Sequence, residues 1–330
     1  MLRIFWVVLV SFSLAASVQA QGTLPTPGKA KPAAVVNGRE IPESAVQRAL
    51  KPIAKEHQEK ARPQIITALI DDALVDNYLE LLKITVEPKE VDAQLETIKK
   101  DILESKQEYA KVLEKMEITE AEFKKEIHNQ LRWEKFVTMQ GTDEKLKRLF
   151  ESSPEIFDGS TVRARHILIA PETPDEKGKT AAIKKLQDIK ATVAAATSAA
   201  ASKTPPDADN LTKQKILHKA TDDAFAAAAK EHSICPTKQD GGTLREFPRM
   251  GMMVEPFAKA AFALEPYQVS GPVETAYGVH LILVTGKKPG EAVKFEAVKG
   301  AVIEVYASRL RDAIIEKMKA DANTKIEVVK

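Results

Sequence analysis

The sequence predicts an α+β protein in which helical segments flank a region with strand-like runs. Apolar residues recur with helical spacing through residues 62–83, 87–102 and 119–137. Two apolar runs without that spacing, VRARHILIA at 162–170 and VSGPVETAYGVHLILV at 269–284, have the composition of β-strands. Helical and strand-like segments therefore both occur in this chain, and an α+β protein is expected.

The first twenty residues differ in character from the rest of the chain. Arg3 precedes an apolar stretch over residues 4–16, and Val18-Gln19-Ala20 has the small-x-Ala form of a cleavage site. The stretch is shorter than the roughly 20 residues that cross a bilayer. Residues 1–20 are therefore expected to be a secretory signal peptide, with an uncleaved anchor as the alternative. We expect an exported protein of the periplasm or extracellular cell envelope, without stable membrane insertion after cleavage.

Charge and cysteine content exclude several functions. The 49 basic and 47 acidic residues leave a net charge of +2, so no overall field attracts nucleic acid. Cys235 is the single cysteine, and an intramolecular disulfide is impossible. It is either a small buried apolar residue or part of a site. No metal site is expected, because the remaining histidines lack ligand spacing: His57, His128, His218 and His232.

The segment before residue 159 is expected to fold as a short hairpin followed by helices. Residues 21–32 have no apolar period and are expected to form a flexible leader. A hairpin then turns at Asn37-Gly38. A helix over 62–83 carries an apolar stripe that includes Leu81 and Leu82. Further helices are expected from Pro88, where proline suits the first turn, and from the capping box at 119–122.

Two later segments also have helical patterns. Between residues 171 and 222, an alanine-rich helix at 191–201, a Pro205-Pro206 break and a helical run at 211–218 predict an extended helical hairpin over the sheet. An amphipathic helix through 298–318 and a strand at 326–329 end the chain. A helix so apolar on one face would be poorly soluble alone, which favours docking against another segment.

Three motifs in residues 162–288 carry the functional signal. A strand-like run contains His166, the lone Cys235 lies six residues before Gly241-Gly242, and a second strand-like run contains His280. This set, in this order, resembles the parvulin-type peptidyl-prolyl cis/trans isomerases. The resemblance implies an FKBP-like domain with a four-stranded antiparallel sheet and surrounding helices.

The resemblance extends to both flanks of this segment. Residues 33–158, with the VNG turn, KITVEPKEVDAQL and ITEAEFKKEIHNQLRWEKFV, resemble the amino-terminal chaperone domain of SurA- and PrsA-type secreted foldases. In such foldases a carboxy-terminal segment packs back onto that domain, which implies the same for residues 290–330. The isomerase domain, residues 159–289, is then an insertion in a mostly α-helical chaperone-like domain.

Isomerisation needs no covalent chemistry. Rotation about an X-Pro bond faces a barrier of about 18–20 kcal/mol from amide resonance. An enzyme needs an apolar slot for the proline ring and polar groups that favour the twisted amide. The resemblance implies that the polar group consists of His166, Cys235, Thr275 and His280. It implies that the substrate-binding residues are Leu244, Met253, Phe257 and Tyr277. The alternative for each apolar residue is core packing, and for the histidines a hydrogen-bonded pair that joins two strands.

Several positions depart from the family pattern. The usual Gly-Gly-Asp-Leu-Gly is GGTLR here, with Thr243 and Arg245 in place of aspartate and glycine, and one extra residue precedes Gly251. These changes put the level of activity in question more than the fold. PETPDEKG at 171–178 stands where phosphate-selective parvulins have a basic cluster. Phosphorylated substrates are therefore not expected, because they need Arg or Lys as partners.

Three functions are weighed. The leading hypothesis is a peptidyl-prolyl isomerase and chaperone that assists the folding of exported proteins, acts on unfolded or proline-containing polypeptides and uses no cofactor. The first alternative is a catalytically weak chaperone whose parvulin domain only binds peptides. The second is a cysteine hydrolase with Cys235 as nucleophile and a histidine as base, although the HSICP context has no hydrolase signature.

Overall fold

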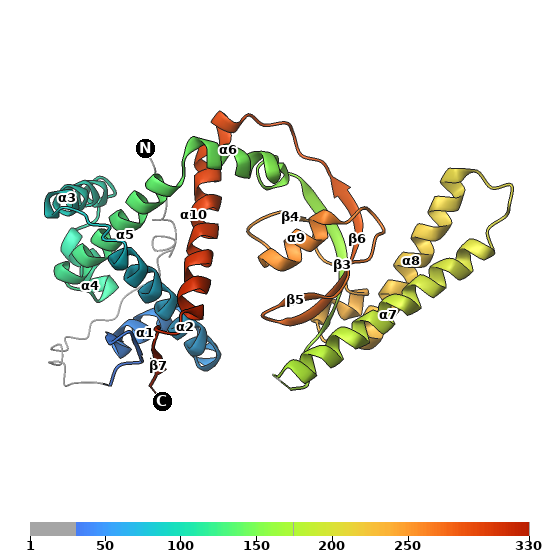
Figure 1. Ribbon diagram of the computed structural model, residues 1–330, viewed down its shortest axis with the longest axis horizontal. Coiled ribbons are helices and arrows are strands. Elements are labelled where there is room, and N and C mark those ends of the chain that lie inside the picture. Colours follow the sequence, from blue (N-terminus) through green and yellow to red (C-terminus); the bar gives the residue numbers. More distant parts are fainter. Residues whose placement is uncertain (1–30, 174, 330) are drawn as a thin grey trace. The chain divides into compact units, whose positions relative to one another are not determined.

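The computed structural model describes residues 31–173 and 175–329 (Figure 1). The expected signal peptide and most of the expected leader lie outside the described residues. The chain divides into two compact units, one made of residues up to 149 together with residues from 299, and the other of residues 150–298. The second unit extends nine residues beyond the expected segment 159–289 at each end: it begins at residue 150 instead of 159 and ends at residue 298 instead of 289.

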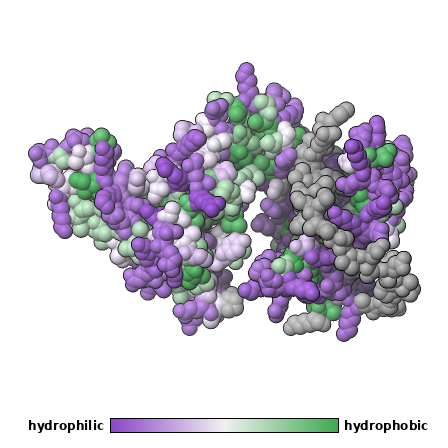
Figure 2. Space-filling model, turned by 180° about the vertical axis from the view of Figure 1, so that it is seen from behind, coloured by the Kyte–Doolittle hydropathy of each residue, from purple (hydrophilic) through white to green (hydrophobic). Residues whose placement is uncertain are grey.

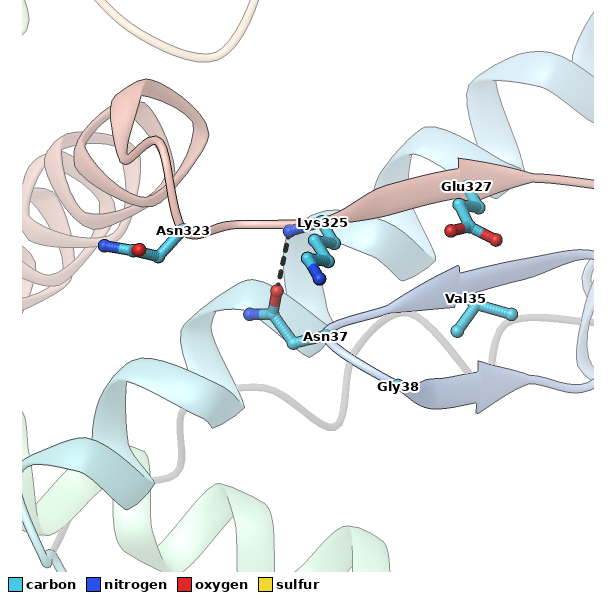
Figure 3. A pocket seen from close by; sticks show the side chains of 6 residues that line it. All are labelled: Val35, Asn37, Gly38, Asn323, Lys325 and Glu327. Carbon is cyan, nitrogen blue, oxygen red and sulfur yellow. Dashed lines mark hydrogen bonds between the residues drawn. The ribbon is translucent and has the colours of Figure 1, made fainter.

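A three-stranded antiparallel sheet joins the two chain segments of the first unit. Its strands lie in the order β2 (Arg39–Ile41), β1 (Ala34–Val36) and β7 (Ile326–Val328). The expected turn is present, since Asn37 and Gly38 both have positive φ, at 50° and 80°. Figure 3 shows the Asn37 side chain accepting a hydrogen bond from the backbone N–H of Lys325 at 2.8 Å, beside a pocket of about 470 Å³.

The rest of the first unit is helical. Its elements are α1 (Glu43–Leu50), α2 (Lys55–Leu81), α3 (Pro88–Glu104), α4 (Tyr109–Met116), α5 (Glu120–Gln140), most of α6 (Asp143–Ser152) and most of α10 (Phe295–Ala320). Helix α5 begins at the expected capping box, in which Thr119 accepts from the N–H of Glu122. The sequence patterns did not predict α4, which packs with α3 and α5 around a small second core.

The main core of this unit lies between the sheet, α1, α2 and α10. Ile314, Ile315 and Met318 of α10 are buried in the same cluster as Leu74 of α2 and Val36 of β1. The carboxy-terminal helix therefore contributes directly to this core, as its apolar face required.

The prediction that the apolar stripe of α2 continues through Leu81 and Leu82 is wrong. Leu81 is 72% exposed and Leu82 is 45% exposed. The helix stops there because Lys83 adopts a left-handed conformation, and the N–H of Ile84 then bonds to the carbonyl of Leu79 at 3.0 Å. This helix end directs Ile84, rather than the two leucines, into the core.

The second unit contains a four-stranded antiparallel sheet in the order β4 (Phe247–Pro248), β3 (Thr161–Ile169), β6 (Gly278–Lys288) and β5 (Val273–Thr275). Residues of the long central strands alternate between two cores. Leu281 and Leu283 face α7 (Glu176–Ser202) and α8 (Asn210–His232). Ile282 and Val284 face α9 (Glu255–Ala263). The expected fold class is confirmed.

Helices α7 and α8 form the expected hairpin against one face of the sheet (Figure 1). Both are longer than the sequence patterns predicted, because Leu186 and Phe225 anchor their inner ends in the sheet core. Thr197 and Thr221 join the helices by a hydroxyl contact of 2.9 Å. Hydrophilic residues predominate on the hairpin surface visible in Figure 2. None of the helices within residues 31–173 and 175–329 is long and apolar enough to cross a membrane.

Candidate active site

Strand alternation places two histidines on the α9 face of the second sheet. His166 follows Val162 and Ala164 on β3 at intervals of two residues, and His280 precedes Ile282 on β6 in the same way. The register opposes His166 to Ile282 and Leu168 to His280, so the two imidazoles are diagonal neighbours on adjacent strands. Their Nδ1 atoms are 3.2 Å apart, and their rings are stacked with an interplanar angle of 18°.

A chain of polar side chains crosses the sheet through this pair. His280 Nε2 lies 2.8 Å from the hydroxyl of Thr275, at the end of β5. At the other end, His166 Nε2 lies 3.3 Å from the hydroxyl of Thr237, which also lies 3.2 Å from Cys235 Sγ. The order of groups is therefore Cys235, Thr237, His166, His280 and Thr275.

The chain has two consistent proton arrangements, because each neutral imidazole carries one N–H. If His166 donates through Nδ1, its Nε2 accepts from Thr237, and His280 donates through Nε2 to Thr275. If His280 donates through Nδ1, its Nε2 accepts from Thr275, and His166 donates through Nε2 to Thr237. In the second arrangement the Thr237 hydroxyl donates to Cys235 Sγ, which is the direction the local geometry supports.

Burial keeps both histidines neutral. His166 and His280 are only 6% and 5% exposed. Burial lowers the pKa of His166 to about 4. Burial and, to a smaller extent, the charge of the neighbouring His166 lower the pKa of His280 to about 4. The pair is therefore an uncharged hydrogen-bonding unit at neutral pH.

Phe257 of α9 covers the histidine pair. Its ring meets His166 and His280 edge to face, at centroid distances of 5.7 and 5.2 Å. Phe257 is buried, whereas Leu244 and Met253 are partly buried and pack against the same cluster. The structure thus brings three of the four expected substrate-binding residues to one core.

Tyr277 differs from the other three expected substrate-binding residues. It lies in the turn between β5 and β6 and is 66% exposed. Its backbone N–H donates to the Thr275 hydroxyl at 3.1 Å. Tyr277 is therefore connected to the polar chain through its backbone, and its ring is directed to solvent.

Thr237 is the site residue that the sequence reasoning missed. Its hydroxyl separates Cys235 Sγ from the nearest imidazole nitrogen. A histidine that activates a cysteine nucleophile must contact the thiol directly, so this geometry disfavours the cysteine hydrolase. A hydroxyl residue two positions after the cysteine, within CPTKQDGG, was the available signal for a bridging role.

Two protein families match parts of this chain. The family described as "PPIC-type PPIASE domain" matches residues 196–286. The family described as "SurA-like N-terminal domain" matches residues 1–137. The chain is thus a parvulin-type peptidyl-prolyl isomerase joined to a SurA-like domain. The first match begins within α7, so β3 with His166 lies outside it.

Sequence relatives define the family more closely. Foldase protein PrsA of Caldanaerobacter subterraneus is 31% identical over 298 residues, which cover 86% of this chain and 82% of that protein. Foldase protein PrsA of Bacillus subtilis is 37% identical over 107 residues, or 32% of this chain and 35% of that protein. The chain belongs to the PrsA foldase family. It is a peptidyl-prolyl cis/trans isomerase and chaperone, of a kind that is exported, so the isomerase and chaperone functions of the leading hypothesis are confirmed.

Solved structures resemble this chain only weakly. A crystal structure of peptidylprolyl isomerase PrsA from Bacillus anthracis covers 78% of this chain and 98% of its own, with 22% identity and a TM-score of 0.39. A structure of SurA-like chaperones from Campylobacter jejuni covers 88% of this chain, with 22% identity and a TM-score of 0.28. The family assignment rests on the sequence relatives.

Proposed function

We propose that proline isomerisation takes place over the His166–His280 pair, with the proline ring held by Phe257, Met253 and Leu244. The single observation that carries this proposal is the hydrogen-bonded chain from Cys235 to Thr275 beneath an aromatic ring. A polar chain with an apolar cover is what the reaction needs, since the ring must leave water while the amide keeps polar partners.

The neutral state of the histidines fits this chemistry. In the twisted amide the nitrogen becomes pyramidal and the carbonyl loses resonance, but no proton has to be transferred. A chain with two proton arrangements can present either a donor or an acceptor at its ends, at Thr275 and at Cys235. In this proposal Cys235 acts electrostatically near the substrate carbonyl, and the histidines position the hydroxyl groups on either side.

We also propose a division of labour between the two units. Residues 33–158 with 290–330 act as the chaperone part, and residues 159–289 as the isomerase part. Clients are unfolded, unphosphorylated polypeptides met after export, in the periplasm or the extracellular cell envelope, and residues 1–20 are the signal peptide that directs export. The absence of a basic cluster in PETPDEKG at 171–178 supports unphosphorylated clients.

The test compares two phenylalanines of α9 in the full chain. Phe257 contacts both histidines, whereas Phe262 packs against the same core and meets Phe247 at a centroid distance of 6.3 Å. Phe257→Ala should reduce kcat/KM on a proline peptide about a hundredfold, while Phe262→Ala should keep nearly full activity per folded molecule. Thermal unfolding measures the folded fraction of each variant.

Two results would contradict the site assignment. One is a Phe257→Ala protein that is folded and fully active. The other is a loss of activity that, in both variants, merely matches the fraction of unfolded protein. Phe257 would then be a core residue with no part in binding.

A further inference from the structure

Arg165 precedes His166 on β3 and therefore points to the opposite face of the sheet, toward α8. Its guanidinium forms a two-pronged ion pair with Asp222 of α8, with Nε–Oδ1 at 2.7 Å and Nη2–Oδ2 at 3.0 Å. The pair is partly buried, with side-chain exposures of 20% and 28%. Hydrogen bonding to Asp222 raises the pKa of Arg165 above its ordinary value.

The third guanidinium nitrogen, Nη1, forms hydrogen bonds with the turn at residues 240–243. Arg165 Nη1 donates to the carbonyl of Asp240 at 2.9 Å, to the carbonyl of Gly241 at 3.3 Å and to the hydroxyl of Thr243 at 2.6 Å. Thr243 in turn donates to the Asp240 carbonyl at 2.7 Å. Thr243 is one of the positions where this chain departs from the family pattern, and its hydroxyl completes the contact with Arg165.

The turn can approach β3 this closely because of its two glycines. Gly241 and Gly242 both have positive φ, at 63° and 78°. A Cβ atom on Gly242 would lie 2.2 Å from the carbonyl oxygen of His166. The carbonyl of Gly242 accepts from the N–H of His166 at 2.9 Å, so the turn is bonded to the strand directly beside the proposed active site.

Both ends of this turn carry residues of the proposed site. The N–H of Gly242 bonds to the carbonyl of Thr237 at 2.9 Å, and this ties the turn to the short 3-10 helix that presents the Thr237 hydroxyl. The N–H of Leu244 bonds to the carbonyl of Ala164 at 2.9 Å, and its side chain joins the core beneath α9. A displacement of the turn would therefore move a hydroxyl of the polar chain and a wall of the proline slot together.

We propose that Arg165, held by Asp222, is a positioning residue for isomerisation. It acts from the far face of the sheet, through the turn at residues 240–243, on Thr237 and Leu244. This inference rests on the site assignment under Proposed function. It also gives α8 a role in the reaction, since Asp222 aligns the guanidinium and thereby connects the hairpin to the active site.

The geometry requires arginine in particular. One fork of the guanidinium engages Asp222, while Nη1 reaches the turn, and the planar group fixes the angle between them. A lysine at this position keeps the positive charge but has one nitrogen, which cannot span Asp222 and the turn in the same way. Arg165→Lys is thus a charge-conserving variant that separates positioning from net charge.

The experiment uses three variants of the full chain. Arg165→Lys removes the guanidinium group, and Asp222→Asn removes the carboxylate with which it pairs. Asp223→Asn makes the same charge change one residue along α8, where the carboxylate pairs with the exposed Lys219 instead. We expect kcat/KM on a proline peptide to fall on the order of tenfold or more for Arg165→Lys, by a smaller factor for Asp222→Asn, and to stay unchanged for Asp223→Asn.

A second readout reports on the site itself. The ¹⁵N shift of His166 Nε2 depends on its contact with Thr237, so it should move in Arg165→Lys and stay constant in Asp223→Asn. A purely structural role would change the melting temperature and leave the shift and the kcat/KM of the folded protein unaltered, and that result would overturn the proposal. So would full activity in Arg165→Lys.

The Phe257→Ala variant, measured in parallel, separates the two proposals. If Phe257→Ala loses activity and Arg165→Lys does not, the site assignment holds and only the positioning role fails. If Phe257→Ala is folded and active, the site assignment itself fails, and with it the basis of this inference.

Discussion

The buried histidine pair predicts how the stability of the second unit changes with pH. His166 and His280 have pKa values of about 4 in the folded protein, compared with 6.5 for an exposed histidine. The unfolded chain therefore takes up two protons between these values that the folded chain does not bind. Stability is at its full value above pH 6.5, declines as the pH falls toward 4, and levels off below that, where both states are protonated.

The magnitude follows from the two pKa values. At about pH 5.5 an unfolded histidine is about 90% protonated, which favours the unfolded chain by on the order of 1 kcal/mol per histidine relative to about pH 7.5. Between about pH 7.5 and about pH 5.5, the two histidines together should lower the free energy of unfolding of the second unit by about 2–3 kcal/mol. Hydrogen exchange reports this quantity as the opening free energy of the strands. Carboxylates contribute little here, because most remain ionised in the unfolded chain above about pH 5.

Hydrogen exchange measured by mass spectrometry on peptides from β3 and β6 tests this prediction, after correction for the intrinsic exchange rate. His280→Gln should show about half the pH dependence, because one of the two titrating groups is gone. His57→Gln, an exposed position in the first unit, serves as the control and should leave it unchanged. An opening free energy that stays constant, or rises, as the pH falls would refute the reasoning.

Three further predictions concern the chemistry and the division of labour. Thr237→Val removes the bridging hydroxyl and should lower the free energy of unfolding by about 1–3 kcal/mol and kcat/KM about tenfold. Thr237→Ser should retain both the stability and the activity. Wild-type kinetics in the valine variant would contradict the bridging role. Cys235→Asp should keep substantial activity in a peptide isomerisation assay, and complete loss in a folded variant would revive a covalent mechanism. Replacing residues 159–289 by a short linker should leave a protein that suppresses client aggregation measured by light scattering; a folded product that protects nothing would place the chaperone function elsewhere.

Local patterns in the sequence were enough for most helices and strands. The Asn37-Gly38 turn, the proline at the start of α3 and the Thr119 capping box each depend on a few neighbouring residues, and each forms where expected. Such signals work because a cap or a turn satisfies backbone groups within one or two turns of chain. The short helices α1 and α4 were missed, since eight residues are too few for a helical period to be recognised.

The sequence by itself determined the fold class, the family and the identity of most candidate site residues, because the motifs around His166, Cys235 and His280 occur in a recognisable order. Only the tertiary structure decided how they connect. The two histidines are 114 positions apart, and their contact depends on the register of β3 against β6. That register brings distant residues together, so no local pattern could show that Thr237 bridges to the pair or that Arg165 supports the turn from the opposite face.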